Sequence, residues 1–273
     1  MSDHEIANQP HADIALRDLS PWLSWWLPFG VFALAFLTLV LYLAFGLPWF
    51  MVLFLAKEGP IEYAAVLVLL LGIFYGIGAF MFRRRLPTRH RTWLSVWLIV
   101  FCLGCVYFTG EELSWGYHIR TQFFGKARTG QPKQTFLGVN EQGETNIHNI
   151  DKWWAKLFGR SSKYILEFGW VYVASLILPL LLRDRKPPLL PQSDGHYWLW
   201  PSMATCGSAA LVFLSYRPWR WTMKLLDIEA TGWRRHSEIQ EFFIATTLML
   251  YLASFYTRLR QMPAQKSSGE SGH

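Results

Sequence analysis

Long apolar stretches alternate with short polar segments along this chain. A helix needs about 20 mostly apolar residues to cross the hydrocarbon core of a bilayer, and several stretches come near that length. The expected spans are Leu27–Phe45, Ile61–Phe82, Thr92–Thr109, Tyr164–Leu182, Tyr197–Tyr216 and Ser237–Tyr256. The pattern therefore predicts an all-α fold, that of a polytopic membrane protein with about six transmembrane helices.

The polar segments divide the chain further. Residues 1–21 are expected to form a cytoplasmic tail, and residues 262–273, which contain Ser and Gly, a flexible C-terminal tail. The membrane domain covers residues 22–261. Within it, residues 111–163 hold two short amphipathic stretches on either side of a loop over residues 125–143 that is rich in Gly, Gln, Pro and Lys. We expect this segment to cap the outer face of the bundle.

Composition supports a membrane protein. Of the 273 residues, 52% are hydrophobic and only 16% are charged, which excludes a sizeable soluble domain. Trp supplies 15 residues, many of them at span ends, where interfacial aromatic belts form. No basic stripe with interleaved aromatic residues stands in a polar segment, so the expected partner is the lipid bilayer and not nucleic acid.

Basic residues in the short loops predict the orientation. Clusters follow spans two, four and six: Arg83, Arg84, Arg85, Arg89, Arg91, Arg183, Arg185, Lys186, Arg258 and Arg260. The positive-inside rule places these clusters, and hence both termini, on the cytoplasmic side of a bacterial inner membrane. A basic loop before span six, with Arg217, Arg220, Lys224, Arg234 and Arg235, argues the other way. The more compact arginine loop after span two decides our assignment.

Small residues predict close contacts between helices. Gly72 and Gly76 form a G-x-x-x-G pattern in span two, and span five is rich in Ser, Ala, Gly and Cys. Small residues let helix backbones approach closely in membranes. Both patterns favour helix packing over chemistry.

Acidic residues gather at the ends of the spans. Four clusters stand out: Glu58 with Glu62, Glu111 with Glu112, Glu144 with His148, and Glu238 with Glu241. An even number of crossings brings all four to the same, outer face of the membrane. Carboxylates beside hydrocarbon are costly, so their convergence indicates a functional site.

The second cluster has two interpretations. If span three ends at Glu111 and Glu112, the two carboxylates meet the negative end of the helix dipole, and a bound cation would compensate for that placement. Alternatively, Thr109 and Glu112 have the spacing of a capping box that begins a new helix.

The remaining clusters are also open to two interpretations. On a helix, Glu144 and His148 lie at i and i+4, where they can share a metal or pass a proton, or they are simply solvated. Glu238 and Glu241 fit either a site or the favourable N-terminus of span six. For Glu62, in the first turn of span two, the helix-start interpretation is favoured.

Taken together, these residues predict a carboxylate-rich pocket with one histidine. The expected metal ligands are Glu112, Glu144, His148, Glu238 and Glu241, and the expected catalytic residues are Glu111, Glu112 and His148. Oxygen-rich ligand shells with one imidazole suit a divalent metal, with Zn, Fe, Mn and Ca all open.

Three motifs carry a resemblance to a known family. They are E-E-L-S-W-G at residues 111–116, Q-G-E-T-N-I-H-N at 142–149 and E-I-Q-E at 238–241. Together they resemble a family of uncharacterised bacterial polytopic membrane proteins, and this resemblance covers most of the chain. It implies a multi-pass membrane fold and transfers no activity.

The first motif also has a second, partial resemblance. It is similar to the E-E-x-x-x-R motif of the CAAX-protease-like glutamate intramembrane proteases, although Gly116 stands in place of the arginine. The resemblance implies that Glu111 and Glu112, together with His148, activate water.

Three classes of function fit these features. The leading hypothesis is a metal-dependent, hydrolase-like enzyme that acts on a lipid or lipid-linked substrate at the periplasmic face, with a glutamate as base and His148 to orient or donate. The alternatives are a proton- or cation-coupled transporter and a non-catalytic assembly or scaffold subunit. Because the clusters lie near one face and not at the midplane of the bilayer, the transporter is disfavoured.

Overall fold

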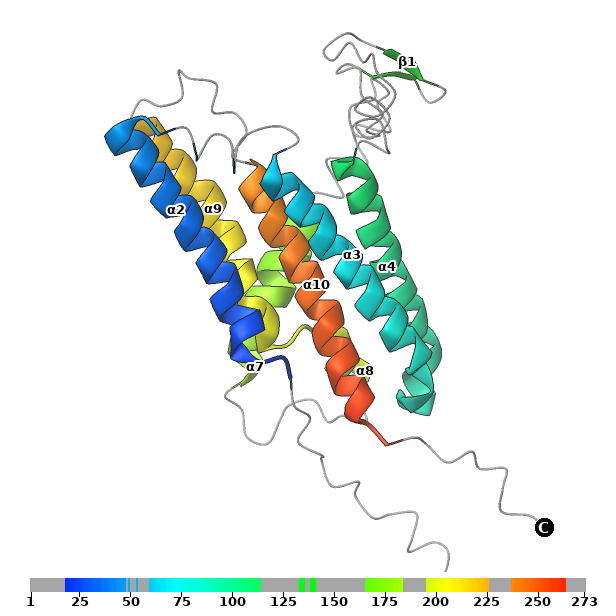
Figure 1. Ribbon diagram of the computed structural model, residues 1–273. Coiled ribbons are helices and arrows are strands. Elements are labelled where there is room, and N and C mark those ends of the chain that lie inside the picture. Colours follow the sequence, from blue (N-terminus) through cyan, green and yellow to red (C-terminus); the bar gives the residue numbers. More distant parts are fainter. Residues whose placement is uncertain are drawn as a thin grey trace, which may run out of the picture.

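The computed structural model describes residues 18–47, 49, 53, 59–113, 133–135, 138–140, 165–183, 195–225 and 237–263. In this part of the chain, long helices run side by side as a bundle (Figure 1). The longest are α2 (Leu27–Phe45), α3 (Pro60–Met81), α4 (Arg91–Glu112), α9 (Cys206–Leu225) and α10 (Ser237–Gln261). A π-helix, η7 (Ile165–Ile177), continues directly into α7 (Leu178–Arg183).

Among the described residues, 4 helices are long and apolar enough to cross a membrane. They are Trp22–Phe45, Pro60–Met81, Thr88–Glu112 and Glu238–Gln261. These helices coincide with the first, second, third and sixth expected spans, so the prediction of a helical membrane protein is confirmed. The fourth expected span corresponds to a shorter apolar helix over Ile165–Leu181.

The fifth expected span lies elsewhere than predicted. We expected one helix from Tyr197 to Tyr216, but the chain forms a short helix, α8 (Gly195–Leu199), and α9 begins only at Cys206 and runs on to Leu225. The hydropathy pattern alone does not reveal this break.

Local chemistry explains the interruption between α8 and α9. Pro201 has no N–H group and cannot continue the hydrogen bonds of α8. The Ser202 hydroxyl then accepts a hydrogen bond from the N–H of Ala204, which begins a 3₁₀ turn, η8 (Met203–Thr205), ahead of α9. A side chain that accepts from a backbone N–H two residues on is a recurrent way to start a helix.

Contacts at the helix ends show which ends meet. Glu167 near the start of η7 is hydrogen-bonded to Gln240 near the start of α10. At the other end of the bundle, Arg85, just beyond α3, donates to the backbone carbonyl of Arg260 near the end of α10. The start of α9 packs there against the π-helical turn η1 (Trp22–Trp26) that leads into α2. In Figure 1, α2, α4 and α9 run one way along the bundle, and α3 and α10 run the other.

Helix α10 is the centre of this bundle. In its most apolar segment 89% of the residues are buried, whereas the figure for the other three candidate spans is between 17% and 33%. Those three helices therefore turn one side toward the bundle and present the other side outward.

The G-x-x-x-G pattern of α3 lies in the contact between α3, α10 and α4, as predicted. A methyl group added at Gly72 would meet the backbone of Met249 at 3.3 Å, and one added at Gly76 would collide with the sulfur of Cys102. Only glycine leaves room for this approach, which is how small residues bring membrane helices together.

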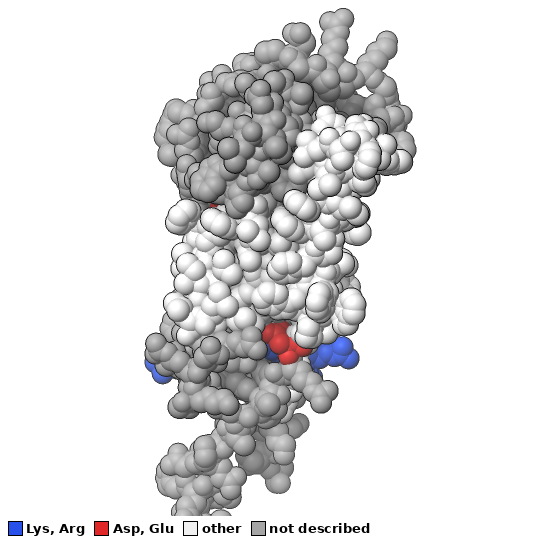
Figure 2. Space-filling model, turned by 90° about the vertical axis from the view of Figure 1, so that its left-hand side faces the viewer, with Lys and Arg blue, Asp and Glu red and all other residues white. Residues whose placement is uncertain are grey.

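The outward faces are apolar. Large side chains such as Leu67, Phe74 and Met81 of α3 and Leu103 of α4 are more than half exposed. Figure 2 shows a broad band without Lys, Arg, Asp or Glu across one face, with coloured side chains gathered mainly along its lower rim. An exposed apolar band of this extent matches the hydrocarbon core of a bilayer.

One correction concerns the segment that we expected to be a loop over residues 125–143. Strands β1 (Lys133–Thr135) and β2 (Gly138–Asn140) pair there as an antiparallel hairpin. The two residues between the strands are Phe136 and Leu137, and neither belongs to the Gly, Asn and Asp residues that mark two-residue hairpin turns. The usual residue signal for a hairpin turn is therefore missing from the sequence here.

Candidate metal site at one end of the bundle

The last turn of α4 carries two adjacent carboxylates. Helix α4 continues through Glu111 and ends at Glu112. The Thr109 hydroxyl donates back to the carbonyl of Cys105 within the same helix, at 2.8 Å. The capping-box interpretation of Thr109 is therefore wrong. Both glutamates stand at the negative end of the α4 dipole, where a carboxylate is disfavoured.

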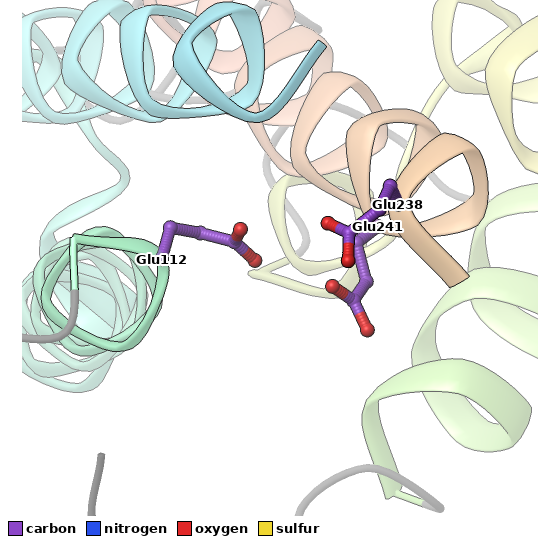
Figure 3. A group of neighbouring side chains, drawn as sticks. All are labelled: Glu112, Glu238 and Glu241. Atoms are coloured by element: carbon purple, nitrogen blue, oxygen red, sulfur yellow. The ribbon is translucent and has the colours of Figure 1, made fainter. Parts of the chain in front are cut away.

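Two more carboxylates come from the first turns of α10. Glu238 and Glu241 lie one turn apart on this helix, so their side chains leave it on the same side. At a helix N-terminus the dipole favours negative charge. Because α4 ends where α10 begins, the Glu112 carboxylate and this acidic pair face one another across the gap between the helices (Figure 3).

The three carboxylates form one compact group. Each of Glu112, Glu238 and Glu241 offers one carboxylate oxygen, and these three oxygens lie within 4.8 Å of one another. All three side chains are half-buried. A divalent cation takes ligands from two or more helices in this way in helical-bundle metal proteins. The expected convergence of glutamates far apart in sequence is thus present for these three, and their role as ligands stays a prediction. We call Glu112, Glu238 and Glu241 the glutamate triad.

Further negative charge surrounds the triad. Glu62 is in the first turn of α3, as predicted, and follows Pro60 in that turn. The charges of Glu62 and of Glu111 both act on the Glu112 carboxylate. Thus α3, α4 and α10 all contribute acid to the same end of the bundle, which we call the acidic end.

Beside the triad, a hydrogen-bonded group fixes the start of α10 against η7. The Glu167 carboxylate accepts from the side-chain amide N–H of Gln240 at 2.9 Å and from the Tyr172 hydroxyl at 3.0 Å. Gln240, between the two triad glutamates of α10, is only 1% exposed. This contact holds the first turn of α10 in place, and with it the direction of the Glu238 and Glu241 side chains.

Sequence reasoning missed Gln240 and Tyr172 as partners of Glu167. A signal was present, because an amide directly before Glu241 in an otherwise apolar helix needs a polar partner when buried. The pairing itself depends on the rotation of η7 against α10, which hydropathy does not report.

Several predicted site residues lie outside the described residues. They are Glu58, Glu144 and His148. Their roles, including those of Glu144 and His148 as metal ligands and of His148 as catalytic residue, stay predictions.

Comparison with protein-family models, with curated proteins and with solved structures finds no match for this chain. The resemblances carried by the E-E-L-S-W-G and Q-G-E-T-N-I-H-N motifs are therefore untested, and function rests on the geometry of the site.

Proposed function

We propose that this chain is a multi-pass protein of the bacterial inner membrane in which the glutamate triad binds a divalent cation and a lipid or lipid-linked substrate is hydrolysed beside it. The observation that carries the proposal is the approach of three ligand oxygens, from α4 and α10, to within 4.8 Å of one another. Helices distant in sequence supply them, and all three lie at the boundary of an apolar band.

Electrostatics supports a cation at this place. Two unit charges separated by 4.8 Å repel by roughly 3 kcal/mol at an effective dielectric constant of about 20, although water reduces this for half-buried groups. The triad contains three such pairs, and the C-terminal dipole of α4 adds to the repulsion on Glu112. A bound divalent cation converts this repulsion into attraction.

The donor set narrows the choice of metal. Carboxylate oxygens are the preferred ligands of hard cations, so the triad alone favours Ca²⁺ or Mn²⁺. Zn²⁺ or Fe²⁺ fits if His148 completes the shell, as we expect from its sequence position, because these ions favour imidazole nitrogen.

Hydrolysis is the chemistry that fits best. A divalent cation supplies Lewis acidity and activates water at neutral pH. Glu111 adjoins the triad in sequence and is our candidate to accept the proton of the attacking water, with His148 to orient the substrate or protonate the leaving group. The hydrogen bonds of Glu167 with Gln240 and Tyr172 would hold the first turn of α10 against η7 during the reaction.

The substrate class and the side of the membrane follow from where the site lies. The triad is at the end of helices whose outward faces are apolar, which would put it at the depth where lipid headgroups meet hydrocarbon. The arginines at the opposite end favour a cytoplasmic location for that end, so the triad would face the periplasm. Six alternating helical segments, including η7–α7 and α9, would give both termini a cytoplasmic location.

A transporter is a weaker fit to the same geometry. Coupled transporters hold ions and substrates near the bilayer midplane, commonly where helices are interrupted. The triad instead occupies the last turn of α4 and the first turns of α10. The interruption between α8 and α9 lies at the other end of the bundle.

Elemental analysis of the purified full-length protein tests the proposal. We expect close to one divalent metal per chain in the wild type and none in the Glu112→Gln, Glu241→Gln double variant. Asp18→Asn is the matched control, since it removes a carboxylate that lies outside the triad and accepts a hydrogen bond from the N–H of Leu19 at 2.7 Å. Metal content equal in the wild type and the double variant would contradict a site at the triad.

The hydrolase step needs its own assay. Wild-type protein in nanodiscs made from bacterial lipid extract should release water-soluble headgroup products, detected by mass spectrometry, and the double variant should not. Metal binding without any released product would support the cation site and contradict the hydrolase activity.

A further inference from the structure

A buried arginine lies at the end of the bundle opposite the triad. Arg258, in the last turn of α10, is only 4% exposed. Its Nε donates to the Ser254 carbonyl at 3.4 Å, and its Nη1 donates to the Tyr197 carbonyl at 3.5 Å. Its Nη2 is buried and has no hydrogen-bond partner within the described part of the chain. Two strong donor hydrogens are therefore left unused.

The surroundings of Arg258 are neutral. The guanidinium carbon lies 5.3 Å from the ring centre of Tyr197 and 5.6 Å from that of Trp198. Aromatic faces and backbone carbonyls share some of the charge, but none of them carries a formal negative charge. A guanidinium this deeply buried is normally paired with a carboxylate or a phosphate. Neither is present around Arg258 among the residues that the structure describes.

We propose that Arg258 binds a phosphate oxyanion at the arginine end of the bundle, through the fork that includes Nη2. The planar guanidinium matches two oxygens of one phosphate group, and this pairing is stronger than a neutral hydrogen bond. The site does not depend on the glutamate triad or on the function proposed for it.

The place of Arg258 indicates where the phosphate comes from. The same end of the bundle carries further arginines, at Arg83, Arg84, Arg85, Arg89, Arg91 and Arg260. A basic cluster beside membrane helices attracts anionic lipid headgroups. A phospholipid phosphate and a free phosphate ion offer the same chemistry to Arg258, so the experiment has one arm for each source.

The lipid arm uses the full-length protein in nanodiscs of phosphatidylcholine with added phosphatidylglycerol. The protein is then washed in detergent with about 1 M NaCl, where the Debye length is about 3 Å and surface attraction is screened. The phospholipid that remains bound is extracted and counted by mass spectrometry, with phosphatidylcholine included because it also carries a phosphate. The ion arm titrates inorganic phosphate in neutral detergent and follows thermal unfolding.

Matched variants separate a specific site from general attraction. Arg260→Gln removes the same charge from the same turn of α10, but Arg260 is exposed. We expect Arg258→Gln to reduce the retained lipid by about tenfold or more, the loss of a charged hydrogen bond, and Arg260→Gln to retain as much as the wild type. Unfolding in pure phosphatidylcholine checks that each variant is folded.

If Arg258→Gln does not fold, Arg258→Lys takes its place, because it keeps the charge and loses the planar fork. An effect of the Arg258 variant on lipid retention only identifies a lipid headgroup as the ligand. A phosphate-dependent shift in thermal unfolding that is lost in the Arg258 variant identifies free phosphate. Either result supports the site. Three results would overturn the proposal. They are equal losses of retained lipid in the Arg258 and Arg260 variants, an Arg258→Lys protein that binds like the wild type, and no effect of Arg258→Gln in either arm.

Discussion

Charged side chains are arranged differently at the two ends of this bundle, dispersed at one end and clustered at the other. At the arginine end, Arg83 donates to the Phe80 carbonyl and lies 4.2 Å from the centre of the Phe80 ring. Arg85 donates to the Arg260 carbonyl and lies 4.8 Å from the centre of the Phe82 ring. Each positive charge is thus distributed over a neighbouring carbonyl and an aromatic face.

At the acidic end, negative charges are brought together instead. Glu112 of α4 approaches Glu238 and Glu241 of α10, although the dipole of α4 itself disfavours a carboxylate at this position. The comparison shows that charge at a membrane boundary does not by itself define a site. Dispersed charges fit an interface with water and headgroups, whereas concentrated like charges need a counter-ion or proton.

The largest expected effect comes from adding a cation. If the triad binds a divalent ion, Ca²⁺ or Mn²⁺ at about 100 times its Kd should raise the free energy of unfolding by about 2.7 kcal/mol. Titration with sodium dodecyl sulfate, with and without the ion, measures this. In Glu112→Gln the increase should disappear, while Arg85→Gln at the other end should keep it in full. An increase that survives in Glu112→Gln would place the ion elsewhere.

The next effect concerns the close contact of α3 with α4 and α10. Gly76→Val would push against Cys102 and should destabilise the protein by about 1–3 kcal/mol. Gly104 of α4 has nothing within 4 Å of an added Cβ, so Gly104→Ala should instead stabilise the helix by about 0.5–1 kcal/mol. The same unfolding titration measures both. Changes of the same sign would show that α3 does not approach α4 and α10 this closely.

The third effect separates a buried amide at the acidic end from an exposed one at the arginine end. Gln240→Leu removes a donor from the Glu167 carboxylate and should cost about 1–2 kcal/mol. Gln261→Leu, on the last residue of the same helix, changes the same residue type in an exposed position and should cost less than about 0.5 kcal/mol. Equal losses in the unfolding free energy would remove the role given to Gln240.

The smallest effect is expected among the dispersed arginines. Arg85→Gln loses one cation–π contact with Phe82 and one hydrogen bond to an exposed carbonyl. We expect a loss of about 0.5–1 kcal/mol in the unfolding free energy, and less in high salt. A loss as large as that from Gly76→Val would mean that the arginine end is also a concentrated site.

Hydropathy located the long helices well and their ends less well. Helix α3 was expected over Ile61–Phe82 and lies at Pro60–Met81. Helix α10 was expected to end at Tyr256 because Arg258 and Arg260 lower the hydropathy of the following residues. It continues to Gln261 because arginine is a good helix former. At the start of α9 the opposite happened, since an apolar run hid the break caused by Pro201.

The convergence of the triad followed from counting crossings, but its membership did not. An even number of spans predicts that the end of α4 and the start of α10 share a face. Glu112, Glu238 and Glu241 were all among the expected ligands, but which carboxylates meet depends on how each helix is rotated about its axis, and the number of crossings does not determine that rotation. Helix rotation is set by packing, such as the glycines of α3 against α10.

Binding of Mn²⁺ to the purified protein, followed by electron paramagnetic resonance, tests the shared cation site most directly. We expect one bound Mn²⁺ per wild-type chain, and a large loss of affinity in Glu112→Gln and in Glu241→Gln, although these residues belong to different helices. If the wild type binds no Mn²⁺, or if only one of the two helices affects binding, then α4 and α10 do not share a cation.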